Sequence, residues 1–503
     1  MGRKHRKSKQ EQPILATHVV LYDEGETFVA SPSDPPAAGL SGSWGVCMNV
    51  LNSIVGAGVI AIPHAMADGG FLPVMMLLIL GALLTMYSMN VIVSLGDLHQ
   101  ADTFEGLAKV AFGYRGFLVV CFFQFVFSFG ANCSYLLVIG DTLPPLVGHL
   151  MNMSFANGSP IATEDTPLWL SVLTSRNYCV TLIAVGILFP ICMQKNFASL
   201  SKFAGLSIVG VIFCGVCILY KCIAQIDSLP LVDSGGTYYD YIAIHHKVFP
   251  AIGTIAFAYV CQHQTYLVYN SMLDKSPQHF AYVSKWSVAA SFFVILLFGI
   301  PGYLMFLKDT HSDIFLNFTD HTDRLIQACR LITVLGMILT FPGEFMVARY
   351  TLQILLEGNY KTNVEHLFLE QDKRTGMFDP EECIVSPTNR SCLQARGQPI
   401  SAFSPRWHFG LTVVLIIAIV TLSLADPNLG DITSLTGSFS AVALAFILPA
   451  ACHLRLGVPP EVHSKWHDHY VPWLTIIFGS IAFVVSTTMS IINIIQHTAE
   501  INT

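Results

Sequence analysis

The sequence is poor in charge: Asp, Glu, Lys and Arg together make up only 12% of its 503 residues. Soluble globular chains carry roughly 25% charged residues, so this deficit excludes an ordinary water-soluble fold. Hydrophobic residues reach 53% and the mean hydropathy is +0.57, so the surplus apolar surface needs lipid as its solvent. The composition therefore predicts an all-α protein that crosses a membrane several times.

Signatures of catalysis and of ATP hydrolysis are also missing. The sequence contains no Gly-x-x-x-x-Gly-Lys-Ser/Thr phosphate loop, no hydrolase motif and no His or Cys spacing typical of a metal site. Most of the 13 Cys fall inside apolar stretches, where we interpret them as small packing residues, and we infer no disulfide. We therefore expect neither an enzyme nor an ATP-driven pump, and no cofactor or nucleic-acid partner.

The first 43 residues lack the apolar core of a secretory signal peptide. We expect residues 1–43 to form a disordered cytoplasmic tail, with the first span serving as its own insertion signal. A transporter domain is predicted at 44–495, with a polar cytoplasmic loop at 358–405 and a short C-terminal segment at 496–503. Eleven apolar spans are predicted within it, at 44–67, 71–96, 116–147, 177–193, 203–223, 247–270, 283–307, 324–356, 407–425, 432–453 and 470–495.

The distribution of basic residues predicts which ends of the spans face the cytoplasm. Most of the 26 Lys and Arg lie in the N-terminal tail and in the segments after spans two, four, six, eight and ten, so this side is cytoplasmic. Three Asn-x-Ser/Thr glycosylation sequons, at Asn152, Asn157 and Asn317, fall in segments on the other side. Because the number of spans is odd, the C-terminus is expected to be extracytoplasmic.

The first span contains residues that weaken a helix at mid-membrane. Gly56 and Gly58 precede Pro63, and bare backbone in a bilayer is tolerated only where it faces a cavity or a ligand. Amides freed at 55–59 would suit a carboxylate, because they lie at the start of a second half-helix. The alternative is that the two glycines only allow close packing of helices.

The sixth span contains a run of polar residues within apolar sequence, since Cys261 is followed by Gln262, His263, Gln264 and Thr265. Four consecutive positions point all round a helix, so some of these side chains would face lipid unless the helix is interrupted. Interruptions in spans one and six are five spans apart, which indicates two inverted repeats with a binding site at their interface. Spans one to five and six to ten form the predicted repeats, and span eleven is an addition.

The eighth span carries Thr340 and Glu344. Thr340 and Asn52 offer neutral oxygens of the kind that an alkali cation accepts beside the carbonyls of an unwound helix. Alternatively, a threonine in a membrane helix bonds only the carbonyl four residues earlier. Glu344 is costly in lipid, so it either pairs with Arg349 or takes part in proton coupling.

Two histidines lie where a proton could be sensed or coupled to transport. His64 directly follows the proline of span one, and His263 lies in the polar run of span six. Either imidazole could titrate near neutral pH, or stay neutral with its hydrogen bonds satisfied. His64, His263 and Glu344 are therefore the candidates for pH sensing or coupling.

Four motifs occur in a characteristic order: NSIVGAGVIAIP from Asn52 to Pro63, IGD ending at Asp141, FAYVC ending at Cys261, and LTFP around Thr340. In order and spacing they resemble the sodium-coupled neutral amino acid transporters, within the amino acid/auxin permease group, over roughly residues 44–495. The resemblance implies a leucine-transporter-like fold, an inverted five-plus-five repeat with one extra helix. It also implies a neutral amino acid as substrate and sodium as the coupling ion.

The resemblance also implies which residues bind. Carried over by position, a sodium site is formed by Asn52, the carbonyl of Val55 and Thr340, and sodium is the only metal expected. Gln262 departs from the family, which usually has His directly after the Cys, followed by a Pro that is absent here. The implied substrate site draws on both broken helices, with Ser53, Gly56, Ala57, Gly58, Phe257 and Cys261.

These features predict a secondary active transporter that moves neutral amino acids across a membrane by sodium symport. The expected partners are the amino acid, sodium or a proton, and the lipid bilayer, and the plasma membrane is favoured as its location. One alternative is a proton-coupled carrier of a lysosomal or vacuolar membrane. Another is a transport-like receptor that senses an amino acid.

Overall fold

The computed structural model describes residues 20–23, 26–29, 42–156, 159–161, 166–193, 204–228, 244–245, 247–320, 322–357, 405–425, 428–457 and 465–502. The chain divides into two compact units, Met1–Leu40 and Ser41–Thr503. In the first unit, strands β1 (Val20–Asp23) and β2 (Glu26–Val29) form an antiparallel pair. Apart from these strands and residues 42–43, the expected N-terminal tail lies outside the described residues, as does most of the predicted 358–405 loop.

The second unit is built almost entirely from helices. A short antiparallel pair, β3 (Phe155–Ala156) and β4 (Ser159–Pro160), follows α5. The principal helices are α1 (Ser43–Ile54), α2 (Ala57–Ile60), α3 (Ile62–Gly69), α4 (Phe71–His99), α5 (Phe104–Leu150), α6 (Leu168–Thr174), α7 (Arg176–Ile183), α8 (Phe189–Cys192), α9 (Ala204–Ala224), α12 (Val248–Tyr259), α13 (Gln262–Asn270), α14 (Pro277–Phe306), α15 (Arg324–Glu357), α19 (Pro405–Ala425), α20 (Leu429–Thr436), α21 (Leu448–Leu456) and α22 (Lys465–Asn502).

Shorter helical turns complete the described part of the second unit. Three π-helical turns join α7 to α8 and α20 to α21: η1 (Ala184–Leu188), η7 (Gly437–Ala441) and η8 (Ala443–Ile447). The 3-10 turns are η4 (Ile226–Ser228), η5 (Leu307–Asp309) and η6 (Ile314–Asn317). The last two lie in the connection between α14 and α15, so this connection is folded.

Most of the apolar ranges predicted as membrane spans form long helices in the structure. Within the described residues, eight helices are long and apolar enough to cross a membrane, or nine if α6 with α7 to α8, bent by 92°, counts as one span. The predicted spans 44–67 and 247–270 are each divided between shorter helices, so neither reaches that length as one helix. The protein is therefore an all-helical membrane protein with several spans.

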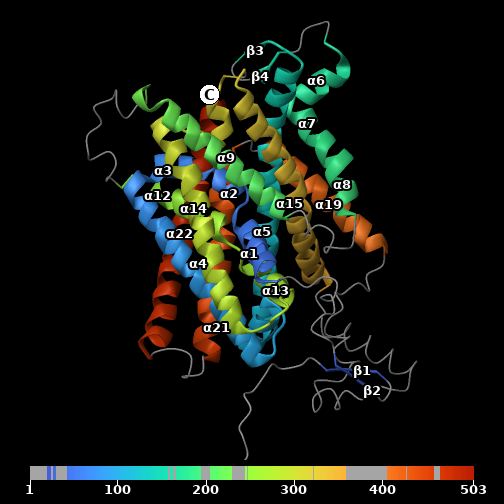
Figure 1. Cartoon of the computed structure of the whole chain (residues 1–503), viewed down its shortest axis with the longest axis vertical. Coiled ribbons are helices and arrows are strands. Elements are labelled where there is room, and N and C mark those ends of the chain that lie inside the picture. The colour runs from blue at the N-terminus through green and yellow to red at the C-terminus, as the bar shows by residue number, and fades with distance from the viewer. Residues whose placement is uncertain are drawn as a thin grey trace, which may run out of the picture. The chain divides into compact units, whose positions relative to one another are not determined.

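The two divided spans run past each other in opposite directions. In Figure 1, α1 and α13 lie below α3 and α12, so the chain rises through the first break and descends through the second. Helix α3 packs against α12, and α1 packs against α13. Helix α2 lies between the two halves of its span and contacts α5, α12 and α14, so the first break is enclosed by other helices.

Small residues bring the helices beside the second broken span into close contact. A Cβ atom on Gly253 of α12 would overlap the carbonyl of Ser434, and one on Gly437 would overlap the carbonyl of Gly253. Small residues let helix backbones approach closely in a membrane, where apolar side chains gain little by leaving lipid. This backbone contact seats α12 against α20 and η7, and so holds the upper half of span six in place.

Candidate functional site: two broken helices

The break in span one lies at two residues. Helix α1 ends at Ile54 and α2 begins at Ala57, while Val55 and Gly56 leave the helical conformation. The amide of Val55 still donates to the carbonyl of Leu51, and that of Gly56 to Ile54. Among the described residues, the amides of Ala57 and Gly58 have no hydrogen-bond acceptor. The sequence predicted free amides over residues 55–59, whereas the structure leaves free only those of Ala57 and Gly58.

The two glycines of span one have different surroundings. A Cβ on Gly56 would lie 3.2 Å from the hydroxyl oxygen of Tyr135, a side chain of α5. A Cβ on Gly58 would lie 2.8 Å from the Cα of Ala258 and 2.9 Å from the ring of Phe257. Gly58 thus permits close packing of α2 on α12, the alternative raised by the sequence, whereas Gly56 faces the end of a polar side chain.

The break in span six lies just before the polar run. Helix α12 ends at Tyr259 and α13 begins at Gln262, so Val260 and Cys261 form the interruption. The polar run is itself helical because its side chains find partners. Gln262 donates to the hydroxyl of Ser88 at 2.7 Å, and Thr265 donates to the carbonyl of Cys261 at 3.1 Å.

The expected substrate residues come from both breaks. The hydroxyl of Ser53 is buried and has no hydrogen-bond partner among the described residues. Phe257 packs against Gly58 and, with ring centroids 5.4 Å apart, against Phe127. Cys261 has its sulfur 3.2 Å from that of Met89, on α4. The structure thus gathers these residues around the meeting of the two broken spans, while Cys261 points toward α4.

The expected cation residues are brought together in part. Val55, Gly56 and Thr340 line a cavity of about 20 Å³, with Ser207 and Thr333 among its other walls. Thr340 donates its hydroxyl to the carbonyl of Gly336 at 2.8 Å, the local bond that the sequence left open as an alternative. Asn52 is absent from this lining, although its side-chain oxygen is buried and has no hydrogen-bond partner among the described residues.

Glu344 lies at the centre of a buried polar cluster. The Nε2 atom of His263 is 2.9 Å from its carboxylate, the hydroxyl of Ser128 donates to it at 2.9 Å, and the amide of Gln264 donates to it as well. The expectation that Glu344 pairs with Arg349 is wrong, because that guanidinium instead reaches another part of the molecule. Side chains of α13 and α5, not Arg349, form the hydrogen bonds to the Glu344 carboxylate.

Arg349 lies one turn further along α15. Its guanidinium donates to the carbonyl of Cys192 at 2.7 Å and to the hydroxyl of Thr412 at 3.1 Å. It therefore links α15 to α8 and α19. Since α8 and α19 come from distant parts of the sequence, spacing along the chain could not have revealed these partners.

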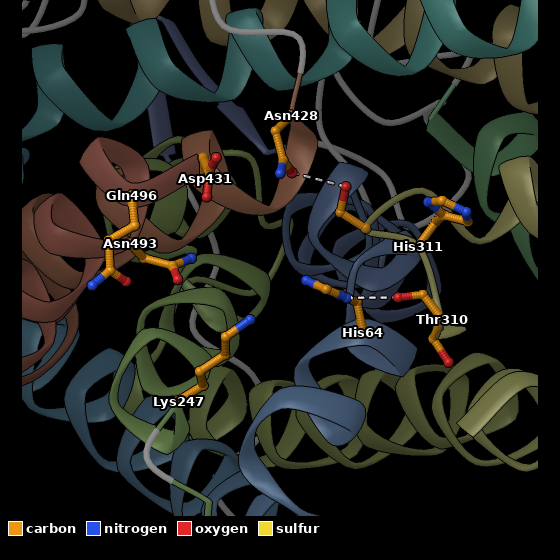
Figure 2. A pocket seen from close by; sticks show the side chains of 9 residues that line it. His64, Lys247, Thr310, His311, Asn428, Asp431, Asn493 and Gln496 are labelled. Carbon is orange, nitrogen blue, oxygen red and sulfur yellow. Dashed lines mark hydrogen bonds between the residues drawn. The ribbon is translucent and has the colours of Figure 1, made fainter. Parts of the chain in front are cut away.

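His64 belongs to a different site, a polar pocket of about 320 Å³ shown in Figure 2. Its Nδ1 atom is 2.7 Å from the carbonyl oxygen of Thr310, and its Nε2 atom is 3.4 Å from Asp68. Lys247 is also 3.4 Å from Asp68. In the figure Lys247 and Asp431 project toward the same space from opposite sides. The pocket therefore presents both signs of charge next to α3, the second half of span one.

Several polar residues of these sites were not predicted. Tyr135 and Ser128 both lie on α5, and their polar positions within an apolar helix were a usable signal. Lys247 and Asp431 lie at the starts of α12 and α20, where charge is ordinary, so composition gave no reason to single them out.

The glycosylation candidates differ in accessibility. Asn152 is exposed at the end of α5, and Asn157 lies outside the described residues. The Asn317 side chain donates to the carbonyl of Asp309 at 2.7 Å and accepts from the amide of His311 at 2.8 Å. A glycan on Asn317 would compete with these two bonds, so Asn152 is the more accessible acceptor.

Two adjacent broken helices within a helical membrane domain define a transporter-type site, and the comparison with known proteins agrees with this class. A model of the transmembrane amino acid transporter protein family matches residues 40–492. The chain therefore belongs to this family, which confirms the resemblance noted in the sequence. Because its relatives and structural neighbours are transporters, the prediction that it is not an enzyme is also confirmed.

Individual relatives match along nearly the whole chain. The mouse "Putative sodium-coupled neutral amino acid transporter 11" is 26% identical over 484 residues, covering 96% of this chain and 92% of the relative. "Vacuolar amino acid transporter 2" of Saccharomyces cerevisiae is 26% identical over 451 residues, covering 89% and 83%. The solved structure of MhsT in complex with L-phenylalanine is 12% identical with a TM-score of 0.52, covering 89% and 98%, a likeness of fold.

Proposed function

We propose that this amino acid transporter carries neutral amino acids by sodium symport. The observation that supports this most strongly is the pair of adjacent breaks, at Val55–Gly56 and Val260–Cys261, in half-helices that run in opposite directions. We further propose eleven spans, in which the first ten form two inverted repeats and the last is an addition. Alternating access would then rock one group of helices against the other around the breaks.

The substrate is proposed to lie against the first break. The unbonded amides of Ala57 and Gly58 and the hydroxyl of Ser53 are donors suited to an α-carboxylate. Tyr135 faces the same place from α5. None of the six residues expected to bind the substrate carries a formal charge, which favours an uncharged side chain on the substrate. These six are Ser53, Gly56, Ala57, Gly58, Phe257 and Cys261. The names of the mouse and yeast relatives agree with an amino acid as cargo.

The coupling ion is proposed to occupy the small cavity between spans one, five and eight. A cavity needs roughly 10–15 Å³ to hold a water molecule, so about 20 Å³ suits one water or one alkali cation. The Thr340 hydroxyl uses its proton on Gly336, which leaves its oxygen lone pairs facing other partners. Asn52 would have to turn toward the cavity to contribute, because it does not line it in this conformation.

The membrane and the orientation also remain proposals. We favour the plasma membrane, with the N-terminus in the cytoplasm and the C-terminus outside, while the yeast relative's name points to a vacuolar membrane as the alternative. Asn152 offers a test of orientation because it is exposed on the side predicted to be extracytoplasmic. A glycan on Asn152, removed in Asn152→Gln, would place that side in the secretory lumen or outside the cell.

Transport by the purified protein in proteoliposomes tests the proposal. Radiolabelled amino acids should be offered with an inward sodium gradient, with sodium replaced by choline, and with an inward pH gradient alone. Accumulation of neutral amino acids that requires sodium is the expected result. Uptake that survives sodium replacement and disappears when the pH gradient collapses would instead favour the proton-coupled carrier.

A further inference from the structure

We propose that His263 and Glu344 form a separate proton site, which couples protonation to movement of the lower half of span six. The inference rests on the proposed transport function and assigns a coupling role beyond the sodium cavity. The two side chains belong to α13 and α15, and their reactive atoms lie 2.9 Å apart. Neither takes part in the proposed sodium site.

Because His263 and Glu344 are buried together, the number of protons that they hold affects the stability of the closed arrangement. Glu344 is 3% exposed and His263 is 7% exposed, so little water reaches either group. A carboxylate beside a neutral imidazole would leave one uncompensated negative charge in a poorly hydrated region, which is costly. One proton shared by the pair makes it neutral overall, either as an ion pair or as two uncharged groups. The closed arrangement therefore favours the singly protonated pair.

Among the residues that the structure describes, no Lys or Arg forms an ion pair with Glu344. Phe127 packs against the imidazole with ring centroids 4.9 Å apart, and Tyr135 of α5 lies within electrostatic range of Glu344. Ser128 and Gln264 are neutral donors to the carboxylate. Charged or titratable groups on the surrounding helices are engaged elsewhere: Asp97 with Tyr269, Glu105 with Tyr350, Arg349 with Cys192 and Thr412, and His453 with Tyr87.

The imidazole also retains a free position for proton exchange. Its Nε2 atom faces Glu344, whereas its Nδ1 atom is buried and has no hydrogen-bond partner among the described residues. An imidazole engaged on one nitrogen can accept or release a proton through the other when water reaches it. Access of water to Nδ1 would require α13 to move away from α5, whose Phe127 covers the ring.

The position of the pair connects the proton to the substrate site. Helix α13 begins directly after the Val260–Cys261 break, and Glu344 holds it to α5 and α15 through three hydrogen-bonding side chains. Opening the lower half of span six therefore requires these bonds to break. Loss of the shared proton weakens the closed arrangement, because it leaves a negative charge buried there. Proton release and opening on that side are thus linked.

Proteoliposomes containing a pH-sensitive dye test the proposal with two readouts. One is exchange of labelled for unlabelled amino acid across the membrane, which needs binding and movement but no net ion flux. The other is proton movement during net uptake. The variants are His263→Gln, which keeps a donor but cannot titrate there, and Glu344→Gln. The half-buried His279, 3.0 Å from Asp274, provides the matched control His279→Gln.

Wild type and His279→Gln should move protons with the amino acid, and both site variants should lose proton movement while at least one retains exchange. Unchanged proton movement in both site variants would overturn the proposal. Net uptake of the amino acid by wild type without any proton movement would also overturn it, while leaving sodium symport intact. Absence of both exchange and uptake for every amino acid in wild type would overturn the proposed transport function and this inference together.

Discussion

The side chain of Tyr135 reaches from α5 to Gly56 in the break of span one. A Cβ atom added to Gly56 would lie 3.2 Å from the Tyr135 hydroxyl oxygen. Tyr135 is 6% exposed, and its hydroxyl points to the unwound residues. In the proposed substrate site, a bound carboxylate would therefore share this space between the bare backbone of span one and the phenol of Tyr135.

This contact predicts different consequences for the two glycines. Gly56→Ala meets the end of a flexible side chain, so the protein should fold while its apparent affinity for the amino acid falls. Gly58→Ala meets the backbone of Ala258 at 2.8 Å and should destabilise the protein by about 1–3 kcal/mol, as overpacking does. Thermal unfolding and substrate titration of both purified variants measure the two effects. Equal loss of stability in both would contradict the distinction.

The proposed cation cavity predicts that an oxygen at position 340 is required. Thr340→Val should raise the sodium concentration for half-maximal uptake by about tenfold, the equivalent of ~1.4 kcal/mol, whereas Thr340→Ser should stay near wild type. Asn52→Ala should change it in the same direction. Thr351→Val is the control, because Thr351 makes the same bond to a carbonyl four residues earlier on the same helix. An unchanged sodium requirement in Thr340→Val and Asn52→Ala would remove both from the site.

The motif residue Asp141 is predicted to act through structure. Its carboxylate lies 2.7 Å from Arg176, with the two side chains 10% and 24% exposed, and so ties α5 to α7. Asp141→Asn should lower the free energy of unfolding by about 1–3 kcal/mol, less than a fully buried pair would lose. Asp102→Asn, in an exposed pair with Lys275 at 3.9 Å, should cost less than about 1 kcal/mol. Similar unfolding temperatures for the two variants would contradict this assignment.

The connection between α14 and α15 predicts a pH-dependent stability. Burial of Asp313 and, to a lesser extent, the nearby charge of Asp141 raise the pKa of the Asp313 carboxyl to about 7, against the opposing effects of the Phe315 amide and Arg330. A carboxyl with a raised pKa in the folded state holds its proton more tightly there than in the unfolded chain. Its contribution is therefore complete below pH about 4 and declines as pH rises through about 7.

Asp313→Asn keeps an oxygen for the amide of Phe315, which lies 2.9 Å from the carboxylate, but does not titrate. The unfolding temperature of wild type should fall more than that of the variant between pH 5 and pH 8. Parallel changes in the two proteins would show that Asp313 does not titrate differently on folding.

Local features of the sequence predict much of the architecture, but they do not predict which polar side chains contact each other. The break in span one could be predicted because Gly56, Gly58 and Pro63 act on the backbone where they stand. The break in span six was expected within the polar run but precedes it, because the side chains from Gln262 to Thr265 find partners and the helix can continue.

The polar partners depend on three-dimensional packing. Glu344 is close in sequence to Arg349, yet its partner His263 is 81 positions away. The polar pocket beside His64 likewise combines His64, Lys247, Thr310 and Asp431 from four separate segments. A single sequence marks such residues as costly in a membrane but contains no measure of which one each will meet.

The central claim is that the break in span one serves the amino acid and the cation together. Equilibrium binding of a labelled neutral amino acid to the purified transporter, with sodium varied against choline, tests it most directly. The account predicts that sodium tightens amino acid binding in wild type, that the amino acid reciprocally tightens sodium binding, and that Thr340→Val weakens this mutual effect. Amino acid binding of equal strength with and without sodium in wild type would contradict it.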